Sequence, residues 1–300
     1  MKIAITGASG MLGTALISLL SKSHEVFATS RNKGIEKKNI EWDCFDLNNF
    51  ELLYTWLKKV KPHIVIHCAA IVDVDFCEKN FELAMSTNTK TTELIAKYIN
   101  FNKGRLIYIS TDSVFDGNKK NSYKEIDTPN PLNIYAKTKL QGEKSVQSIS
   151  TGLVLRVNII GLRQNRNNSF AEWILQKLIQ GSSLNLFHDV YFSPISVQEL
   201  SIIINKIIQK PIYGLYHCGS SDSISKYEFG KKMSEIFQLS NLKINKVSID
   251  SLNFKAKRPK NMSLNTSKIK LDLIHDISSV ENTIKLLKND YEKNLMKYKN

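Results

Sequence analysis

The first twenty residues constrain the fold most, because a short apolar run leads through a glycine-rich turn directly into a helix. Residues 2–6 predict a buried parallel strand, and leucines with helical spacing follow over residues 12–20. The turn between them contains Gly7, Gly10 and Gly13. Glycines there permit a tight turn and let backbone N–H groups approach a pyrophosphate at the helix N-terminus. The spacing is G-x-x-G-x-x-G, which differs from the G-x-G-x-x-G fingerprint, so a turn without a ligand stays open.

The next part of the chain alternates between apolar runs and helix-like segments. The apolar runs lie at 25–29, 63–69, 105–110 and 152–157, and the helix-like segments lie near 48–60, 82–100 and 133–149. Such alternation is typical of parallel strands joined by helical crossovers. It predicts an α/β fold with a Rossmann-type, doubly wound parallel sheet.

The pattern becomes less regular after residue 158. Helices are expected at 168–180, 196–209 and 225–238, and short strands at 184–187 and 214–218. No linker rich in proline or glycine divides the chain. We therefore expect a nucleotide-binding Rossmann domain over residues 1–157. Residues 158–300 are expected to form mainly a small C-terminal substrate-binding lobe, with the chain passing between the two parts more than once.

Tyr135 and Lys139 are four residues apart in a predicted helix, so both side chains lie on one face. An ammonium beside a phenol favours the phenolate and lowers a pKa that starts near 10. Such a phenol can give a proton to a carbonyl oxygen. Thr111 follows a predicted strand, at the strand end where parallel sheets bind ligands, and its hydroxyl can hold the same oxygen.

Taken in order, these motifs resemble the extended short-chain dehydrogenase/reductase family, and within it the dTDP-4-dehydrorhamnose reductases and related nucleotide-sugar reductases. The resemblance spans nearly the whole chain. It rests on the glycine turn, Asp46-Leu47, the strand ending in Ala69-Ala70, Val74 to Glu78, Asn88, Ser110 to Gly117, Tyr135 to Glu143, and Arg258 to Asn261.

The resemblance implies NAD(P)H-dependent reduction of a nucleotide-linked 4-keto-6-deoxy sugar for cell-surface polysaccharide precursors. It implies Thr111, Tyr135 and Lys139 as catalytic residues, with Lys139 also anchoring the nicotinamide ribose. The implied cofactor-binding residues are Gly7, Ser9, Gly10, Met11, Leu12, Gly13, Ser30, Arg31, Asp46, Leu47, Ala69, Ala70, Tyr135, Lys139 and Asn158. The implied substrate-binding residues are Val74, Asp112, Ser113, Ile159 and Arg258.

The end of the second predicted strand decides between the two nicotinamide cofactors. An acid there binds the ribose diol of NAD, whereas a small hydroxyl and an arginine suit the 2′-phosphate of NADP. This strand ends in Ser30-Arg31, and no carboxylate is close to it. A guanidinium binds phosphate well. NADPH is therefore the expected cofactor, with NADH as the alternative.

Three other functions compete with the reductase. A 4,6-dehydratase of the same family has an Asp-Glu pair after the threonine, and this chain has Asp112-Ser113 instead. An epimerase uses the same three catalytic residues with tightly held NAD, which Ser30-Arg31 disfavours. The regulatory beta subunit of methionine adenosyltransferase resembles these reductases and works as a binding partner, so the motifs alone leave a non-catalytic role open.

Two departures from the family concern the substrate and the metal. Rhamnose-pathway reductases tend to have a tyrosine at Ser113 and often a tryptophan near Asn158, so a differently shaped sugar pocket is expected, for an N-acetylated or other deoxy sugar. Some members carry a metal-binding glutamate where this chain has Ala15. No metal site is expected.

The composition adds what the protein is expected to bind and where it is expected to work. The formal net charge of +14 comes from lysines spread along 300 residues, without the arginine-rich or aromatic-interleaved patches typical of nucleic-acid binding. This general positive field would help to attract a dianionic nucleotide sugar. No run of 18 apolar residues or signal peptide is seen, and the four cysteines lack metal-ligand spacing. We expect a cytoplasmic protein with no membrane insertion and no nucleic-acid partner, and a homodimer stays open.

Overall fold

A seven-stranded parallel sheet forms the centre of the protein in the computed structural model, which describes residues 1–34, 39–162, 169–239 and 243–297, the side chains of 294–297 excepted. The strand order is β11-β6-β5-β4-β1-β2-β3. Their bounds are β1 (Lys2–Thr6), β2 (Glu25–Ser30), β3 (Ile40–Cys44), β4 (Ile64–His67), β5 (Arg105–Thr111), β6 (Gly152–Val157) and β11 (Gly214–Cys218).

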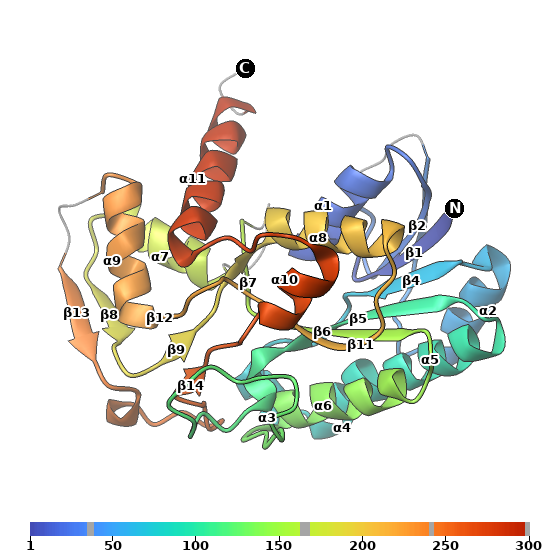
Figure 1. The fold of residues 1–300 in the computed structure, drawn as a ribbon, viewed down its shortest axis with the longest axis horizontal. Coiled ribbons are helices and arrows are strands. Elements are labelled where there is room, and N and C mark those ends of the chain that lie inside the picture. Colours follow the sequence, from blue (N-terminus) through green and yellow to red (C-terminus); the bar gives the residue numbers. More distant parts are fainter. Residues whose placement is uncertain (35–38, 163–168, 240–242, 298–300) are drawn as a thin grey trace.

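Helices cover both faces of this sheet (Figure 1). One face packs against α1 (Met11–Leu20), α8 (Val197–Gln209) and α10 (Ser267–Leu273). The other face packs against α2 (Phe50–Val60), α5 (Thr91–Phe101) and α6 (Ile134–Gln147). Both faces of the central strands are therefore buried, which is why these strands are continuous apolar runs. The predicted doubly wound α/β fold is confirmed.

Two strands of the sheet differ from the sequence-based expectation. No strand was expected at β3, because Glu41 and Asp43 interrupt its apolar residues; an edge strand tolerates such charges. β11, expected as a short strand after residue 158, pairs with β6 in the central sheet and follows α8, which packs beside α1. The second half of the chain thus returns to the central sheet. The proposed domain boundary at residue 157 stays a prediction.

Most of the remaining elements form what we call the second lobe, at the left of Figure 1. Its core is built from three helices and small sheets around Phe192 and Phe229. The helices are α7 (Phe170–Ile179), α9 (Lys226–Ile236) and α11 (Val280–Lys297), and residue 168 of the predicted first helix lies outside the described residues. The strands are β8 (Leu184–Phe187), β9 (Tyr191–Phe192), β12 (Ile224–Ser225), β13 (Ile244–Val247) and β14 (Asn261–Met262). Two short strands, β7 (Ile159–Ile160) and β10 (Ile195–Ser196), pair with each other.

The helix expected over 82–100 is interrupted. It consists of α4 (Phe81–Met85), a π-helical turn at Ser86–Lys90 and α5, and a short helix α3 (Val74–Lys79) precedes it. Single π-helical turns within α-helices are frequently found at functional sites. Among the described residues no helix is long and apolar enough to cross a membrane.

Candidate active site

The glycine turn between β1 and α1 brings the backbone into close contact with the end of β4. Gly7 has a φ of +64°, and a Cβ on it would lie 2.7 Å from the backbone nitrogen of Ala69. A Cβ on Gly13 would lie 2.5 Å from the carbonyl oxygen of Gly7. Only glycine fits at these two positions. No side chain caps the first N–H groups of α1 at Gly10, so they remain suited to bind a pyrophosphate.

Thr111 and Tyr135 come together at the carboxyl end of the sheet. Thr111 is the last residue of β5, and its hydroxyl accepts a hydrogen bond of 3.1 Å from the backbone N–H of Ser113. Tyr135 lies in the first turn of α6, and its phenol interacts with the Thr111 hydroxyl. The proton donor and the orienting hydroxyl predicted from sequence are therefore neighbours.

The pKa of Tyr135 moves in the direction opposite to the sequence expectation. Burial raises the pKa of the phenol well above its ordinary value of 10, the Thr111 hydroxyl opposes this, and the Asp112 carboxylate adds to it. The expected lowering of the Tyr135 pKa by Lys139 is not found, because the Lys139 amine is turned towards β5. A phenol with a raised pKa stays protonated at neutral pH, which is the form needed to donate a proton.

Lys139 follows Tyr135 by one turn on α6 and is buried, with 2% of its surface exposed. Its Nζ donates a 2.7 Å hydrogen bond to the carbonyl oxygen of Ile109 and lies 4.0 Å from the centre of the Tyr108 ring. Burial lowers the pKa of Lys139 to about 7, and the Glu143 carboxylate opposes the shift. A lysine with this pKa can gain or lose a proton near neutrality.

Three polar side chains fix the start and the face of α6. Asn133 caps the helix at Ala136 and donates a 2.9 Å hydrogen bond to the carbonyl oxygen of Lys257. Glu78 of α3 accepts a 2.8 Å hydrogen bond from the N–H of Ile134. Asn88, in the π-helical turn, donates to the Thr138 hydroxyl and to the carbonyl of Ile71. These contacts orient the helix that carries Tyr135 and Lys139.

A buried ion pair ties the same helix to two strands. Arg156 of β6 and Glu143 of α6 are 2% and 1% exposed, and their closest contact, Nη2 to Oε2, is 2.7 Å. The Ser110 hydroxyl of β5 also donates to Glu143, at 2.5 Å. Glu143 lies one turn beyond Lys139 on the same helix face. The pair therefore holds α6 in register with the strand that ends at Thr111.

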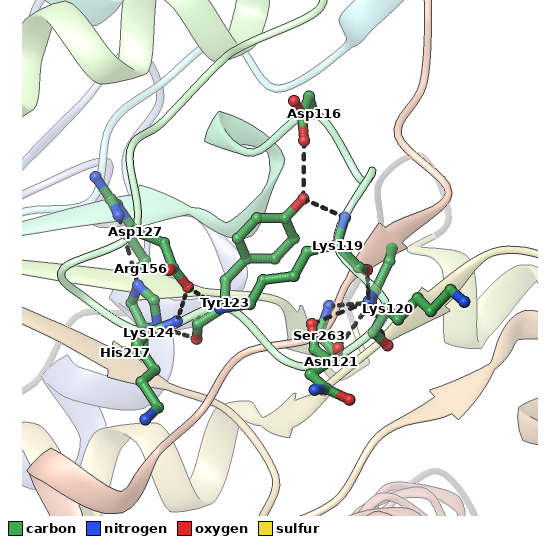
Figure 2. Close-up of polar contacts among 11 residues, drawn as sticks. Asp116, Lys119, Lys120, Asn121, Tyr123, Lys124, Asp127, Arg156, His217 and Ser263 are labelled. Atoms are coloured by element: carbon green, nitrogen blue, oxygen red, sulfur yellow. Dashed lines mark hydrogen bonds and ion pairs between the residues drawn. The ribbon is translucent and has the colours of Figure 1, made fainter.

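The loop that follows Thr111 is anchored to both lobes, as Figure 2 shows. Tyr123 stacks on Phe115 at 4.0 Å, and its hydroxyl donates to Asp116 at 2.8 Å. The carbonyl of Tyr123 lies 3.0 Å from Nδ1 of His217 in β11, and Asn261 of β14 donates to the carbonyl of Lys119 at 2.6 Å. This loop, which lies between Thr111 and Tyr135 in the sequence, thus links the central sheet to the second lobe.

The predicted cofactor residues lie along the carboxyl edge of the sheet. Ser30, at the end of β2, donates to the carbonyl of Asn32 at 2.5 Å, and Arg31 beside it is exposed. Asp46 accepts from both nitrogens of Asn48, at 2.9 and 2.8 Å. Asn158 donates to the Asp112 carboxylate at 2.6 Å. The other predicted positions lie at the same edge, in the glycine turn (Ser9), at the start of α1 (Met11, Leu12), just after β3 (Leu47) and just after β4 (Ala69, Ala70).

The predicted substrate residues come from four separate segments. Ser113 follows Asp112 directly, whereas Val74 begins α3 and Ile159 begins β7. Arg258 forms a 2.8 Å ion pair with Asp75 of α3 rather than a contact with Thr111 or Tyr135. No group of three or more metal-binding side chains is found among the described residues.

Three further residues at the site were not predicted as functional. Glu143 and Arg156 form the buried pair, and Lys226 of α9 interacts electrostatically with Asp112. Glu143 could have been found from its spacing of four residues after Lys139. Lys226 gives no such signal, because the fold alone brings α9 to Asp112.

Fold and site together define a Rossmann-type α/β protein of the short-chain dehydrogenase/reductase kind, and comparisons with known proteins specify the family. The model of the RmlD substrate binding domain family matches residues 1–292, so the chain belongs to that family.

Two relatives and one solved structure show how varied the similar proteins are. The dTDP-4-dehydrorhamnose reductase of Bacillus anthracis, crystallised with NADP, is 29% identical, with a TM-score of 0.84 over 96% of this chain and 99% of that one. The "Probable low-salt glycan biosynthesis reductase Agl14" of Haloferax volcanii is 27% identical over 90% of this chain and 91% of that protein. The methionine adenosyltransferase 2 subunit beta of Xenopus laevis is 32% identical over 88% of this chain and 80% of that protein.

Proposed function

We propose that this protein is an NADPH-dependent reductase of a nucleotide-linked 4-keto-6-deoxy sugar in the cytoplasm, where it serves the synthesis of cell-surface polysaccharide precursors. The observation that carries the proposal is the meeting of Thr111 and Tyr135 above Lys139 at the sheet edge that also bears the glycine turn. The similarity to two reductases supports an oxidoreductase. The sugar class is our proposal.

The residues present fit a dinucleotide. The close approach at Gly7 and Gly13 and the uncapped start of α1 suit a pyrophosphate, and Ser30-Arg31 suits a 2′-phosphate, so NADPH is preferred and NADH is the alternative. NADPH supplies the hydride when it is bound. The role of this chain's residues is to hold the sugar and to move a proton.

Thr111 would donate a hydrogen bond that orients the C4 carbonyl oxygen. The hydroxyl of Tyr135 would give its proton to that oxygen as charge develops on it, and Lys139 would anchor the nicotinamide ribose. The raised pKa of Tyr135 favours this direction, because the donor stays protonated before the reaction. Placing the reactants raises the rate, and the proton donor alone raises it by about 10²–10⁴-fold.

A non-catalytic regulatory subunit is the second candidate, because a methionine adenosyltransferase beta subunit is 32% identical to this chain. An NADPH-oxidation assay with dTDP-, UDP-, GDP- and CDP-linked 4-keto sugars separates the two. We expect NADPH to be oxidised only when one of these sugars is present. No oxidation with any of them, together with binding to a methionine adenosyltransferase catalytic subunit, would favour the regulatory role.

A further inference from the structure

Lys226 places a positive charge where the second lobe meets the end of β5. It is the first residue of α9, and its backbone N–H donates to the carbonyl of Val190 at 2.9 Å. Its Nζ lies 3.5 Å from the centre of the Phe192 ring and 4.0 Å from that of Phe170. The ammonium is thus held over two aromatic faces, which attract a cation.

The pairing of β9 with β14 connects the two aromatic rings to the candidate active site. Phe192 of β9 is the register partner of Met262 of β14. The sulfur of Met262 lies 3.7 Å from the hydroxyl of Ser113, which follows Asp112 and Thr111. Lys226 therefore stands beside the residues that would surround the sugar.

The Lys226 ammonium has no polar partner in the described part of the chain. No acceptor there hydrogen-bonds to it, and no carboxylate lies within ion-pair distance; its contacts are the two rings. Burial lowers the pKa of Lys226 to about 8, Asp112 opposes the shift and Arg258 adds to it. A partly buried ammonium without an acceptor is costly, whereas an apolar side chain would pack well over the two rings. A ligand oxygen would offset this cost.

The surroundings specify what that ligand group offers. Lys226 provides a donor, Met262 provides apolar surface, and the Ser113 hydroxyl, whose proton points to Asp112 or Met262, keeps lone pairs that accept. A carboxylate on the ligand would face the Asp112 carboxylate. An acylamino group offers a carbonyl oxygen, a methyl group and an N–H without a charge, and so complements all three.

We propose that Lys226 recognises the carbonyl oxygen of an acylamino substituent on the sugar of the substrate. This inference rests on the proposed nucleotide-sugar function, since it names the sugar class that the same site takes. It makes Lys226 a specificity residue rather than a catalytic one, because it acts on a substituent beside the reacting carbon.

The test measures binding, by calorimetry with NADP⁺ present, of two ligand pairs that differ only in one group. The pairs are UDP-N-acetylglucosamine against UDP-glucose, and the same sugars linked to dTDP. We expect the wild type to bind the acetamido member of at least one pair about 10–100-fold more tightly, the scale of one hydrogen bond to a charged group. Lys226→Met should reduce this ratio to about threefold or less.

Two further variants test whether the effect is specific to Lys226 and whether it arises from poor folding. Lys231→Met changes an exposed lysine of the same helix and should keep the wild-type ratio. Lys226→Gln keeps a donor and should retain part of the preference, which also tests the proposal if the methionine variant folds poorly. Equal binding within each pair, binding of neither pair, or an unchanged ratio in both Lys226 variants would overturn the proposal.

The outcome is separable from that of the proposed function. Selective binding of the acetamido sugar without NADPH oxidation by any 4-keto sugar would leave the Lys226 assignment standing and remove the reductase. Oxidation of NADPH without selectivity for the acetamido group would do the reverse.

Discussion

The buried pair of Arg156 and Glu143 offers the sharpest test of how α6 is positioned. Arg156→Met removes three N–H contacts to Glu143, at 3.0, 3.2 and 2.7 Å, and leaves a carboxylate that is 1% exposed without its counter-ion. Breaking one partner of a buried pair costs about 3–5 kcal/mol, because the other charge stays buried and unpaired. We expect a loss of that size in the free energy of unfolding.

Urea denaturation followed by circular dichroism measures this loss. The double variant Arg156→Met/Glu143→Leu should be destabilised by less than Arg156→Met alone, since no charge is left buried. The exposed pair of Lys97 and Glu93 on α5 is the matched control, and Lys97→Met should change stability by about 0.5 kcal/mol or less. A loss below about 1 kcal/mol for Arg156→Met would refute the argument that this pair holds α6 to the sheet.

Three further variants test the roles of single residues. Tyr135→Phe should leave NADPH binding nearly intact and lower turnover at least about a hundredfold in a steady-state assay, because only the proton donor is lost; near-normal turnover would remove Tyr135 from catalysis. The pKa of Lys139 is about 7 in the folded protein and 10.5 in the unfolded chain. Between these pH values only the unfolded chain binds the proton. The contribution of Lys139 to the free energy of unfolding therefore grows as the pH rises from 7 to 10. The difference in unfolding free energy between wild type and Lys139→Met should grow in that sense, and a flat difference would contradict the buried neutral amine. Arg31→Ala should weaken NADPH by about 1.5–3 kcal/mol in a fluorescence titration and leave NADH unchanged, and adding Ser30→Asp should tilt the preference towards NADH; equal losses for both cofactors would show that Arg31 does not bind the 2′-phosphate.

Local sequence patterns were sufficient to predict most of the central sheet. Apolar runs bounded by turns predicted β1, β4, β5 and β6, because strands buried on both faces must be apolar along their length. β3 was not predicted because it is an edge strand and carries the charged residues Glu41 and Asp43. The pairing of β11 with β6 depends on contacts between residues about 60 positions apart, which no local pattern records.

The candidate site divides in the same way. The positions of Tyr135 and Lys139 on one helix could be predicted from their spacing, and that of Thr111 at a strand end from the apolar run before it; their catalytic roles stay predictions. The direction of the shift in the Tyr135 pKa could not be predicted, because it depends on burial and on where the Lys139 amine points. Lys226 is more than 100 residues from Thr111 in sequence, and only the packing of the second lobe brings it to Asp112.

The most direct test of the reductase account follows a deuteride from the cofactor. The protein is incubated with NADPH carrying deuterium at the transferable C4 position and with the 4-keto sugar that it reduces fastest, and the product is analysed by mass spectrometry and NMR. The account predicts one deuterium at C4 of the sugar and one NADP⁺ formed for each product molecule, both lost in Tyr135→Phe. A sugar product without deuterium, formed without net oxidation of NADPH, would contradict the account and favour an epimerase.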